Sequence, residues 1–374
     1  MDFAYSEQQT QLKDSVDRFL TDRYDLRKRK ALMGDAAGAE ALWREMAELG
    51  WMGAAFSEAD GGFAESALDA FAVMEAFGRR LMALPYLTSV VLCGDLLRHA
   101  PAADDLIASM IAGRLHLALA ACGNTLLHSP HHGALDAKRD GAGHVLNGRM
   151  SVVLGADRAD KLLVAARTAG ADGERRGVTL FLADAGKVAR RGFRMIDGLG
   201  AAEVEIDNLA LGPDAVIGDP DEAVPLIEAA LDRATVMACG EAVGSMSHLI
   251  PATAQHIRTR EQYGAPLAKF QVLQHRMADA FIAAETARSM AYVAAIGLDA
   301  GRDPAAVSSA KYQVGRSSRL VSYQAVQLHG GIGVSEELDI SHHHIRLTMI
   351  DRLFGDQAFH LRRYADLTQL GAPA

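Results

Sequence analysis

The amino-acid sequence predicts an α+β fold with an all-helical N-terminal domain, a middle β-barrel-like domain and a helical C-terminal domain. Apolar residues recur at the spacing of helix faces as far as about residue 113, and again over longer stretches beyond residue 223. Between these regions, short apolar runs alternate with Gly, Asp and Asn, which is typical of strands and turns. We therefore expect domains at residues 1–113, 114–223 and 224–374.

The N-terminal domain carries clear helix boundary signals. Ser6 and Gln9 form a capping-box pattern, in which each side chain can satisfy a free backbone N–H of the first turn. A second helix has its apolar face over residues 42–49 and is expected to end at Gly50. A third helix is expected over residues 68–81.

The middle domain is predicted to contain short strands joined by tight turns. Asn147-Gly148 predicts a hairpin, because both residues tolerate positive φ. Asp207-Asn208 predicts another turn. The predicted strands are Leu115–Ala121, His144–Leu146, Met150–Val153, Lys161–Ala166, Val178–Leu182, Val204–Ile206 and Leu209–Leu211.

The C-terminal domain is predicted to be a four-helix bundle. One helix carries an apolar stripe from Phe270 and closes at Gly301. Asp303 and Pro304 then fit the N-cap and first turn of the next helix, which stops at Gly330-Gly331. Two further helices, one before this pair and one after it, would complete the bundle.

Composition and charge exclude several classes of protein. Hydrophobic residues make up 49% of the chain but aromatic residues only 6%, which favours packed helices over a sheet-dominated fold. A net charge of −9 argues against nucleic-acid binding, which needs clustered Lys and Arg. No run of about 18 apolar residues is present, so no membrane span is expected.

The cysteines and the N-terminal segment indicate a cytoplasmic protein. Cys93, Cys122 and Cys239 are scattered, without the spacing of metal ligands or of a disulfide framework. The first residues show no basic start followed by an apolar stretch, so no secretory signal is expected. A reducing compartment fits both observations.

Three C-terminal segments carry the strongest functional signal. They are Arg260-Glu-Gln-Tyr-Gly264, Phe270-Gln271 and Gln327-Leu-His-Gly-Gly-Ile-Gly333. Their order and spacing resemble the flavin-binding C-terminal domain of the acyl-CoA dehydrogenase family. The order of helices, strands and helices at this length is similar too, so the resemblance covers nearly the whole chain.

Each segment also has a plainer interpretation on its own. Arg260 fits an ordinary solvated helix residue. The pair Gly330-Gly331 fits a simple helix C-cap. These readings weaken because the segments occur together.

The resemblance implies an FAD site that crosses a subunit boundary, so oligomerisation is part of the site. In the family, these residues reach the flavin of a neighbouring subunit. The implied contacts are Arg260, Gln262, Tyr263, Phe270 and Gln271 at the pyrophosphate and adenine side, and Gln327, Leu328, Gly330 and Gly331 at the adenosine end.

The implied reaction converts a saturated acyl-CoA into a trans-2-enoyl-CoA. A carboxylate removes the α-proton of the thioester while the flavin accepts hydride from the β-carbon. The electrons then pass to an electron-transfer flavoprotein. Base and flavin must face opposite sides of the substrate, which is a strict positional demand.

The chain departs from the family at the base. Phe354 stands where the family usually has its glutamate, and the alternative position falls near Arg233. Neither side chain can accept a proton. Asp356 is the nearest carboxylate and the candidate substitute base, although a solvated or helix-capping role fits it equally. Asp232 and Asp351 are weaker candidates.

The middle domain departs as well. The segment Ala120–Thr125 lacks the family's Thr-Glu-Pro-type pattern, and Val152 and Leu154 replace a tryptophan and a threonine that flank the flavin ring. The chain thus keeps the residues that would contact the flavin of a neighbouring subunit. It lacks the residues that would hold the flavin ring within the same subunit.

This asymmetry suggests pairing between two related chains. The resemblance implies a homotetramer, or a heterotetramer with a related large subunit that supplies the glutamate. Within the family, the finer resemblance is to the small subunits of heteromeric members such as pimeloyl-CoA dehydrogenase. It rests on Lys269–His275, Ala325–Gly333, Arg346–Asp351 and Phe354–Asp356.

Two other functions remain open at this point. One is a non-catalytic partner that only completes a flavin site in a related chain. The other is a flavin oxidase or monooxygenase on the same fold, which needs no glutamate at Phe354.

His342-His343-His344 does not predict a metal site. Consecutive helical residues point about 100° apart, so three adjacent imidazoles do not converge on one ion. We expect surface histidines here, and no metal is predicted.

Overall fold

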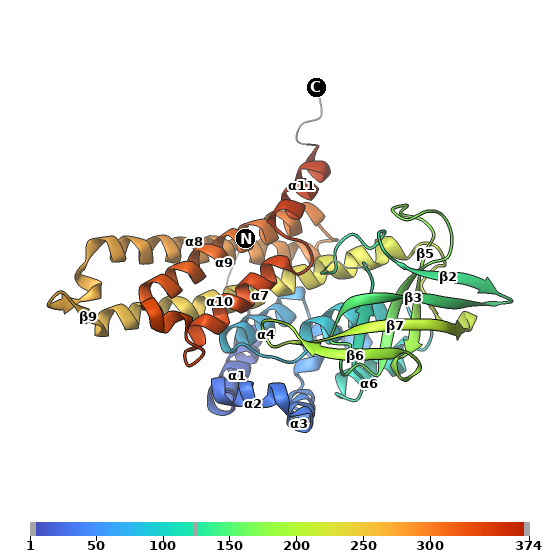
Figure 1. Ribbon diagram of the computed structural model, residues 1–374, viewed down its shortest axis with the longest axis horizontal. Helices are drawn as coiled ribbons and strands as arrows, with labels where there is room; N and C mark the ends of the chain where they lie inside the picture. Colours follow the sequence, from blue (N-terminus) through green and yellow to red (C-terminus); the bar gives the residue numbers. More distant parts are fainter. Residues whose placement is uncertain (1–4, 123–125, 370–374) are drawn as a thin grey trace. The chain divides into compact units, whose positions relative to one another are not determined.

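The computed structural model describes residues 5–122 and 126–369. These residues form two compact units, described separately below (Figure 1). The first unit contains residues 1–31, 66–82 and 235–374, and the second contains residues 32–65 and 83–234, as far as they are described.

The described helices and strands follow the predicted order of helices, strands and helices, so the α+β fold class is confirmed. The helices are α1 (Glu7–Arg23), α2 (Leu26–Gly34), α3 (Ala36–Glu48), α4 (Ala67–Arg80), α5 (Gly94–Leu97), α6 (Ala103–Ile111), α7 (Ala223–Thr259), α8 (Gln271–Asp299), α9 (Pro304–His329), α10 (Asp339–Arg352) and α11 (Gln357–Thr368). The strands are β1 (Leu117–Ala120), β2 (Leu135–Asp140), β3 (Gly143–Leu154), β4 (Lys161–Arg167), β5 (Val178–Asp184), β6 (Ala189–Arg194), β7 (Gly200–Leu211), β8 (Val216–Ile217), β9 (Glu261–Gln262) and β10 (Ala265–Pro266).

The predicted helix boundaries at the N-terminus are confirmed. Gln9 N donates to Ser6 Oγ at 3.2 Å, and Ser6 N donates to Gln9 Oε1 at 3.0 Å. Gly50 follows α3 with φ 82°, a conformation that favours glycine. No described helix is long and apolar enough to cross a membrane.

The second unit is organised around a mixed sheet with the strand order β6-β7-β3-β2-β4-β5-β8. Strands β1 and β2 both pair with β4 in parallel, and the other ladders are antiparallel. Figure 1 shows β2, β3, β7 and β6 side by side. Buried Ala, Leu and Val side chains such as Leu146, Leu162 and Val164 form its core.

The two predicted turns in this sheet are wrong. Asn147-Gly148 lies inside β3, and Asp207-Asn208 lies inside β7. The two pairs face each other across the β3–β7 ladder, where the register shifts between Leu146 and Gly148. Asn208 has φ 50°, and its N–H donates to Asn147 Oδ1 at 2.8 Å. The positive φ of Asn208, which would also suit a hairpin turn, here belongs to a β-bulge within the paired strands.

Sequence patterning also missed three strands of this sheet, namely β2, β6 and the two-residue β8. In β6 all six residues are exposed, and three of them are arginines. This is the composition of a protected edge strand, which has no apolar period to detect. Strand β2 is buried only at Leu135 and Ala137, which is too short an alternation to stand out.

In the first unit, the four predicted C-terminal helices are α7, α8, α9 and α10, and α11 adds a helix that packs on α9. Figure 1 shows α8, α9 and α10 side by side. Asp303 caps α9 as predicted, because its Oδ1 accepts from the N–H groups of Ala305 and Ala306 at 3.0 Å each.

Helices α4 and α7 cross with their backbones in contact within the first unit. A Cβ added at Gly78 would lie 1.8 Å from Glu241 O, and one at Gly244 would lie 1.8 Å from Glu75 O. No side chain larger than hydrogen fits at either position without moving the helices.

Candidate functional site

A pocket in the first unit brings together the end of α7, the first turns of α8 and the end of α9. We call it the C-terminal pocket, and its volume is about 370 Å³. Its lining residues are His256, Arg260, Leu267, Leu273, Arg276, Gln327, Leu328, His329, Gly330 and Gly331.

Five of the residues singled out from the sequence line this pocket together. They are Arg260, Gln327, Leu328, Gly330 and Gly331. Arg260 and the segment Gln327–Gly331 are far apart in the sequence but lie together in this pocket, which fits the resemblance. The other four cofactor candidates lie beside the pocket without lining it: Gln262, Tyr263, Phe270 and Gln271.

A small hairpin positions Arg260 at the pocket. The Arg260 N–H donates to His256 O at 2.9 Å, and Arg260 O accepts from the Leu267 N–H at 2.8 Å. Strands β9 and β10 are joined through Tyr263 and Gly264, which have φ 55° and 75°. Two successive positive φ angles give the two-residue turn that matches the twist of a hairpin.

The exposed Tyr263 and the half-buried Phe270 form an aromatic pair at this hairpin. Their ring centroids lie 6.1 Å apart in an edge-to-face arrangement. Tyr263 is 93% exposed, although a tyrosine ring ordinarily buries much of its surface. Gln262 and Gln271 are exposed as well. Gln262, Tyr263 and Gln271 are thus free to contact a ligand or another chain.

The glycine pair leaves open space at the end of α9. Gly330 has φ 65°, so the backbone itself requires a glycine there. Gly331 has no such requirement, and a Cβ added at either residue would meet no atom within 4 Å. Packing within the chain therefore does not explain Gly331, and the space beside it is open to a ligand.

The pocket is basic. Arg260 and Arg276 both line it, and no acidic residue is among its described lining residues. The rings of His256 and His329 stack with centroids 4.2 Å apart. Burial, followed by the nearby His329 and Arg260, lowers the pKa of His256. Such a pocket favours a phosphorylated anion.

Helix geometry could have identified some of the lining residues that the motifs missed. His256 precedes Arg260 by one helical turn, and Arg276 follows Leu273 by three residues. Residues three or four apart share a helix face. His329 sits inside the motif itself, and its Nδ1 donates to Ala325 O at 2.8 Å.

The segment with the expected base position lies elsewhere in the first unit. Phe354 is 2% exposed and has φ 60°. His360 Nε2 donates to Phe354 O at 3.0 Å. Lys311 Nζ donates to Asp351 O at 3.0 Å and to Gly355 O at 2.8 Å. The turn is thus held by several hydrogen bonds, but the Phe354 side chain is a hydrocarbon and cannot accept a proton.

Asp356 has a structural role at this turn. Its Oδ1 accepts from the Phe359 N–H at 2.9 Å, which caps α11. Its Oδ2 pairs with Arg352 at 3.2 Å. Lys311, which contacts this turn, precedes Gln327 by about 24 Å of helix at 1.5 Å per residue. Asp356 and the C-terminal pocket of one chain are therefore well separated.

The remaining sequence candidates also lie outside the C-terminal pocket. In the second unit, the Arg233 guanidinium lies 3.9 Å from Asp95. Asp232 is buried, and Asp351 accepts from Gln357 Nε2 at 3.1 Å.

In the second unit, Val152 is half-buried and Leu154 is buried within β3. Of the segment Ala120–Thr125, residues 123–125 lie outside the described part of the chain.

Comparisons with known proteins agree with this architecture. Residues 6–103 match the family model described as acyl-CoA dehydrogenase, N-terminal domain, and residues 224–366 match the one described as acyl-CoA dehydrogenase, C-terminal domain. The acyl-CoA dehydrogenase FadE12 of Mycobacterium tuberculosis (strain H37Rv) is 26% identical over 313 residues, which cover 80% of each chain.

Two solved complexes share the fold along the whole chain. The ChsE4–ChsE5 complex from Mycobacterium tuberculosis aligns with a TM-score of 0.87 and 25% identity, over 100% of both chains. The Tcur3481–Tcur3483 steroid ACAD aligns with a TM-score of 0.86 and 26% identity, over 98% of this chain and 99% of that one. The chain therefore belongs to the acyl-CoA dehydrogenase family, a family of FAD-dependent oxidoreductases.

Proposed function

We propose that this chain is one subunit of an FAD-dependent acyl-CoA dehydrogenase and completes a flavin site held mainly by a related chain. The observation that carries the proposal is the meeting of Arg260 with the Gln327–Gly331 turn in one basic pocket. Two arginines and an open glycine backbone fit a pyrophosphate and its adenosine.

The residues of the C-terminal pocket divide into distinct tasks. Arg260 and Arg276 would hold the phosphates, and the backbone at Gly331 would let the cofactor approach closely. The exposed Tyr263 ring and the half-buried Phe270 ring would cover the cofactor from one side. When bound, FAD supplies the acceptor for the hydride that leaves the β-carbon of the substrate.

The α-proton requires a base that this chain does not offer at the usual position. Phe354 is buried hydrocarbon, and both oxygens of Asp356 are engaged in capping and an ion pair. We therefore assign Asp356 a structural role and place the proton-removing carboxylate on the partner. The finer resemblance to small subunits such as that of pimeloyl-CoA dehydrogenase fits this arrangement.

The solved relatives support a heteromeric assembly. ChsE4–ChsE5 and Tcur3481–Tcur3483 are each named as a pair of different chains. A shared site of this kind needs only one glutamate for each flavin. The substrate class would be a saturated acyl-CoA thioester, and the electrons would pass to an electron-transfer flavoprotein.

Flavin content separates this proposal from its rivals. The chain is purified alone and after co-expression with a related subunit that carries the glutamate, and visible absorbance is recorded before and after adding an acyl-CoA. We expect little flavin in the chain alone, and bound flavin that bleaches with substrate in the complex.

Other outcomes would assign the chain differently. A yellow chain that bleaches by itself with an acyl-CoA would be an independent dehydrogenase. Rapid oxygen consumption would indicate an oxidase or monooxygenase. A complex that binds flavin equally well without this chain would remove its role in the site.

A further inference from the structure

Three side chains with metal-ligating atoms meet on facing sides of α7 and α10 in the first unit. His248 comes from α7, and Asp339 and His343 come from α10. One ligand atom from each lies within 4.8 Å of the others. Asp339 and His343 are four residues apart on one helix, so they share a face.

The hydrogen bonds of this cluster already orient the imidazoles. His248 Nε2 and Asp339 Oδ2 lie 2.7 Å apart. The His248 and His343 rings are stacked, with centroids 4.6 Å apart and an interplanar angle of 20°. His343 Nδ1 lies 2.7 Å from Ser245 Oγ. If the serine oxygen accepts from Nδ1–H, the lone pair of His343 Nε2 remains for an ion.

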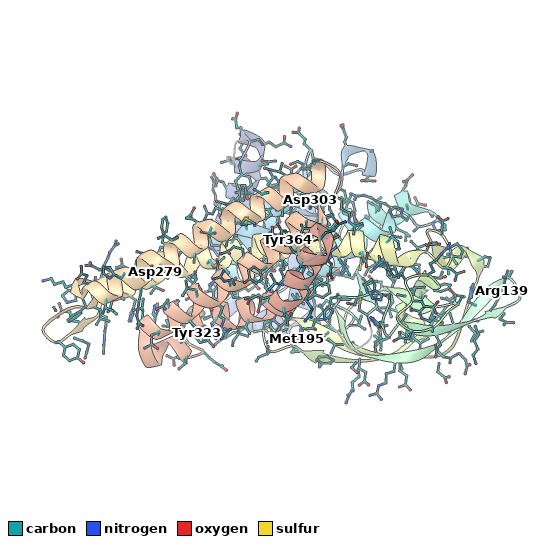
Figure 2. All side chains as sticks on the ribbon, turned by 90° about the horizontal axis from the view of Figure 1, so that it is seen from above. Arg139, Met195, Asp279, Asp303, Tyr323 and Tyr364 are labelled. Atoms are coloured by element: carbon teal, nitrogen blue, oxygen red, sulfur yellow. The ribbon has the colours of Figure 1, made fainter. Side chains whose placement is uncertain are left out.

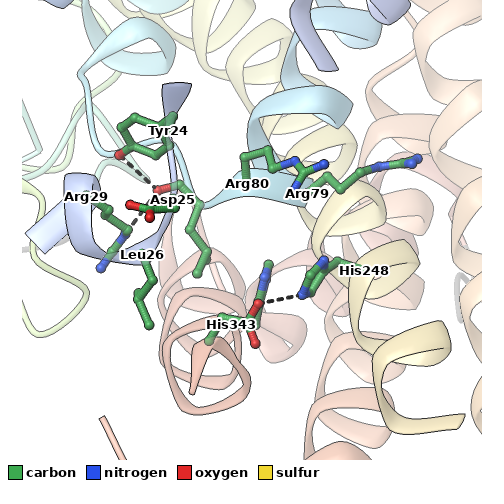
Figure 3. Close-up of a pocket in the computed structure, with 10 residues that line it drawn as sticks. Tyr24, Asp25, Leu26, Arg29, Arg79, Arg80, His248 and His343 are labelled. Carbon is green, nitrogen blue, oxygen red and sulfur yellow. Dashed lines mark hydrogen bonds and ion pairs between the residues drawn. The ribbon is translucent and has the colours of Figure 1, made fainter. Parts of the chain in front are cut away.

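The cluster faces a cavity of about 150 Å³, which can hold an ion and several waters. His343 is 1% exposed, whereas His248 and Asp339 are partly exposed. Figure 3 shows His248 and His343 with other residues of its wall. The lining residues are Tyr24, Asp25, Leu26, Arg29, Arg79, Arg80, Leu81, His248, Asp339 and His343.

Three arginines in the wall oppose a cation, but each guanidinium has a partner elsewhere. Arg29 Nε donates to Leu81 O at 3.0 Å. Arg79 lies 3.8 Å from Asp17, and Arg80 donates to Thr21 Oγ1. Their charge favours a water or an anion, rather than another neutral protein ligand, at the remaining coordination positions.

We propose that His248, Asp339 and His343 bind a divalent first-row transition-metal ion, with Zn²⁺ the best match to two imidazoles and one carboxylate. Zn–N and Zn–O bonds are about 2.0–2.2 Å. The ligand atoms, which lie within 4.8 Å of one another, would draw together and the stacked imidazoles would turn when the ion binds. The ion would replace the proton between His248 and Asp339. It would also tie α7 to the first turn of α10.

The neighbouring histidines provide matched controls. His342 lies 3.1 Å from Glu336 O through Nε2, and His344 Nδ1 lies 3.0 Å from Ser322 Oγ. The three histidines thus have separate partners, as the argument from helix geometry predicts. The expectation that all three lie at the surface is wrong for His343, which is buried. What the sequence could not show is that His343 meets His248, 95 residues earlier, and Asp339, one helical turn earlier.

Cobalt binding tests the proposal in the full chain, because Co²⁺ occupies zinc sites and gives visible d–d absorption. We expect one Co²⁺ per chain, displaced by Zn²⁺, and a rise in Tm with either ion because only the folded chain holds the site. His342→Gln and His344→Gln should bind as tightly as the wild type.

Loss of a ligand should weaken binding by more than the roughly 10- to 100-fold expected for loss of an outer partner such as Ser245. His248→Gln and Asp339→Asn are the primary ligand variants, since both positions are partly exposed and tolerate substitution better than buried His343. Circular dichroism confirms that each variant is folded.

Two results would overturn the proposal. One is a wild-type chain that takes up neither Co²⁺ nor Zn²⁺ in stoichiometric amount. The other is metal binding that survives His248→Gln and Asp339→Asn, which would show an adventitious ion only. Neither result affects the flavin proposal, which concerns the C-terminal pocket.

Discussion

Arg260 is the residue whose role can be tested most directly, because its helix offers a control. We expect Arg260→Ala to weaken FAD binding in the assembled enzyme about 10- to 100-fold, since a charge-assisted phosphate contact contributes about 1.5–3 kcal/mol. Arg258→Ala removes an exposed arginine of the same helix that does not line the pocket and should leave binding unchanged. Flavin fluorescence during titration measures both, and equal losses would contradict the assignment.

Lys311 offers a second residue-scale test, based on pH. Burial lowers its pKa from 10.5 to about 8, while its Nζ donates to two carbonyl oxygens of the Phe354 turn. Lys311→Met should destabilise the fold by about 1–3 kcal/mol at pH 7, because both oxygens lose their donor. Denaturant unfolding measures this difference.

The difference in unfolding free energy between the wild type and Lys311→Met should depend on pH. Between pH 8 and 10.5 the folded wild type binds fewer protons at Lys311 than the unfolded chain does. Its stability relative to the variant should therefore rise with pH over that range. A difference that stays constant would contradict a depressed lysine pKa.

Individual residues also show how far sequence reasoning reaches into the site. Arg260, Gln327 and Gly331 belong to a motif, so their meeting in one pocket could be anticipated. Arg276 belongs to none of these motifs, and only the positions of the helices show that it lines the pocket. The contact between His248 and Asp339 spans 91 residues, and no local pattern encodes it.

Among the elements, the crossing of α4 and α7 makes the sharpest structural demand. Gly244→Ala would place a Cβ 1.8 Å from Glu75 O, which cannot be relieved by a side-chain rotation. We expect a loss of about 1–3 kcal/mol or more. Gly297→Ala in α8 is the control, because its nearest neighbour would be 3.7 Å away.

The two glycines should respond in opposite directions. Gly297→Ala should leave stability unchanged or raise it by up to about 1 kcal/mol, since alanine favours a helix interior. Thermal unfolding of the two variants measures both effects. Equal melting temperatures for them would contradict the tight crossing.

Helix ends could be predicted from sequence because their capping hydrogen bonds are local. Turns in the sheet were predicted wrongly because the residues concerned pair with another strand. The caps at Ser6 and Asp303 are local hydrogen bonds and were predictable. Asn147 and Asn208 look like turn residues, but they form a bulge because each faces the other across two strands. That pairing depends on register, which is a tertiary property.

At the scale of the whole molecule, exposed apolar residues on α8 bear on how the chain assembles with other subunits. Val272, Phe281 and Ile282 are 60%, 54% and 62% exposed on this helix. Figure 2 shows Asp279 on the same stretch and Tyr323 on α9. The adjacent Phe281 and Ile282 are typical of a surface that another subunit covers.

We expect Ile282→Asp to shift the assembled enzyme toward smaller species, because burying an unpaired carboxylate at an interface is costly. Leu49→Asp, at a leucine outside α8 that is 47% exposed, should leave the assembly intact. Sedimentation velocity distinguishes the two variants. Identical profiles for Ile282→Asp and the wild type would show that this part of α8 faces solvent in the assembly.

The open backbone at Gly331 has a consequence for how such a chain changes over evolutionary time. A contact made by a main-chain amide has no side chain to lose, so substitutions in the surrounding residues leave it in place. A subunit that no longer performs the proton transfer would thus keep its nucleotide-recognition signature long after other parts of the ancestral site had drifted. In a saturation library selected for FAD binding, Gly330 and Gly331 should tolerate replacement poorly.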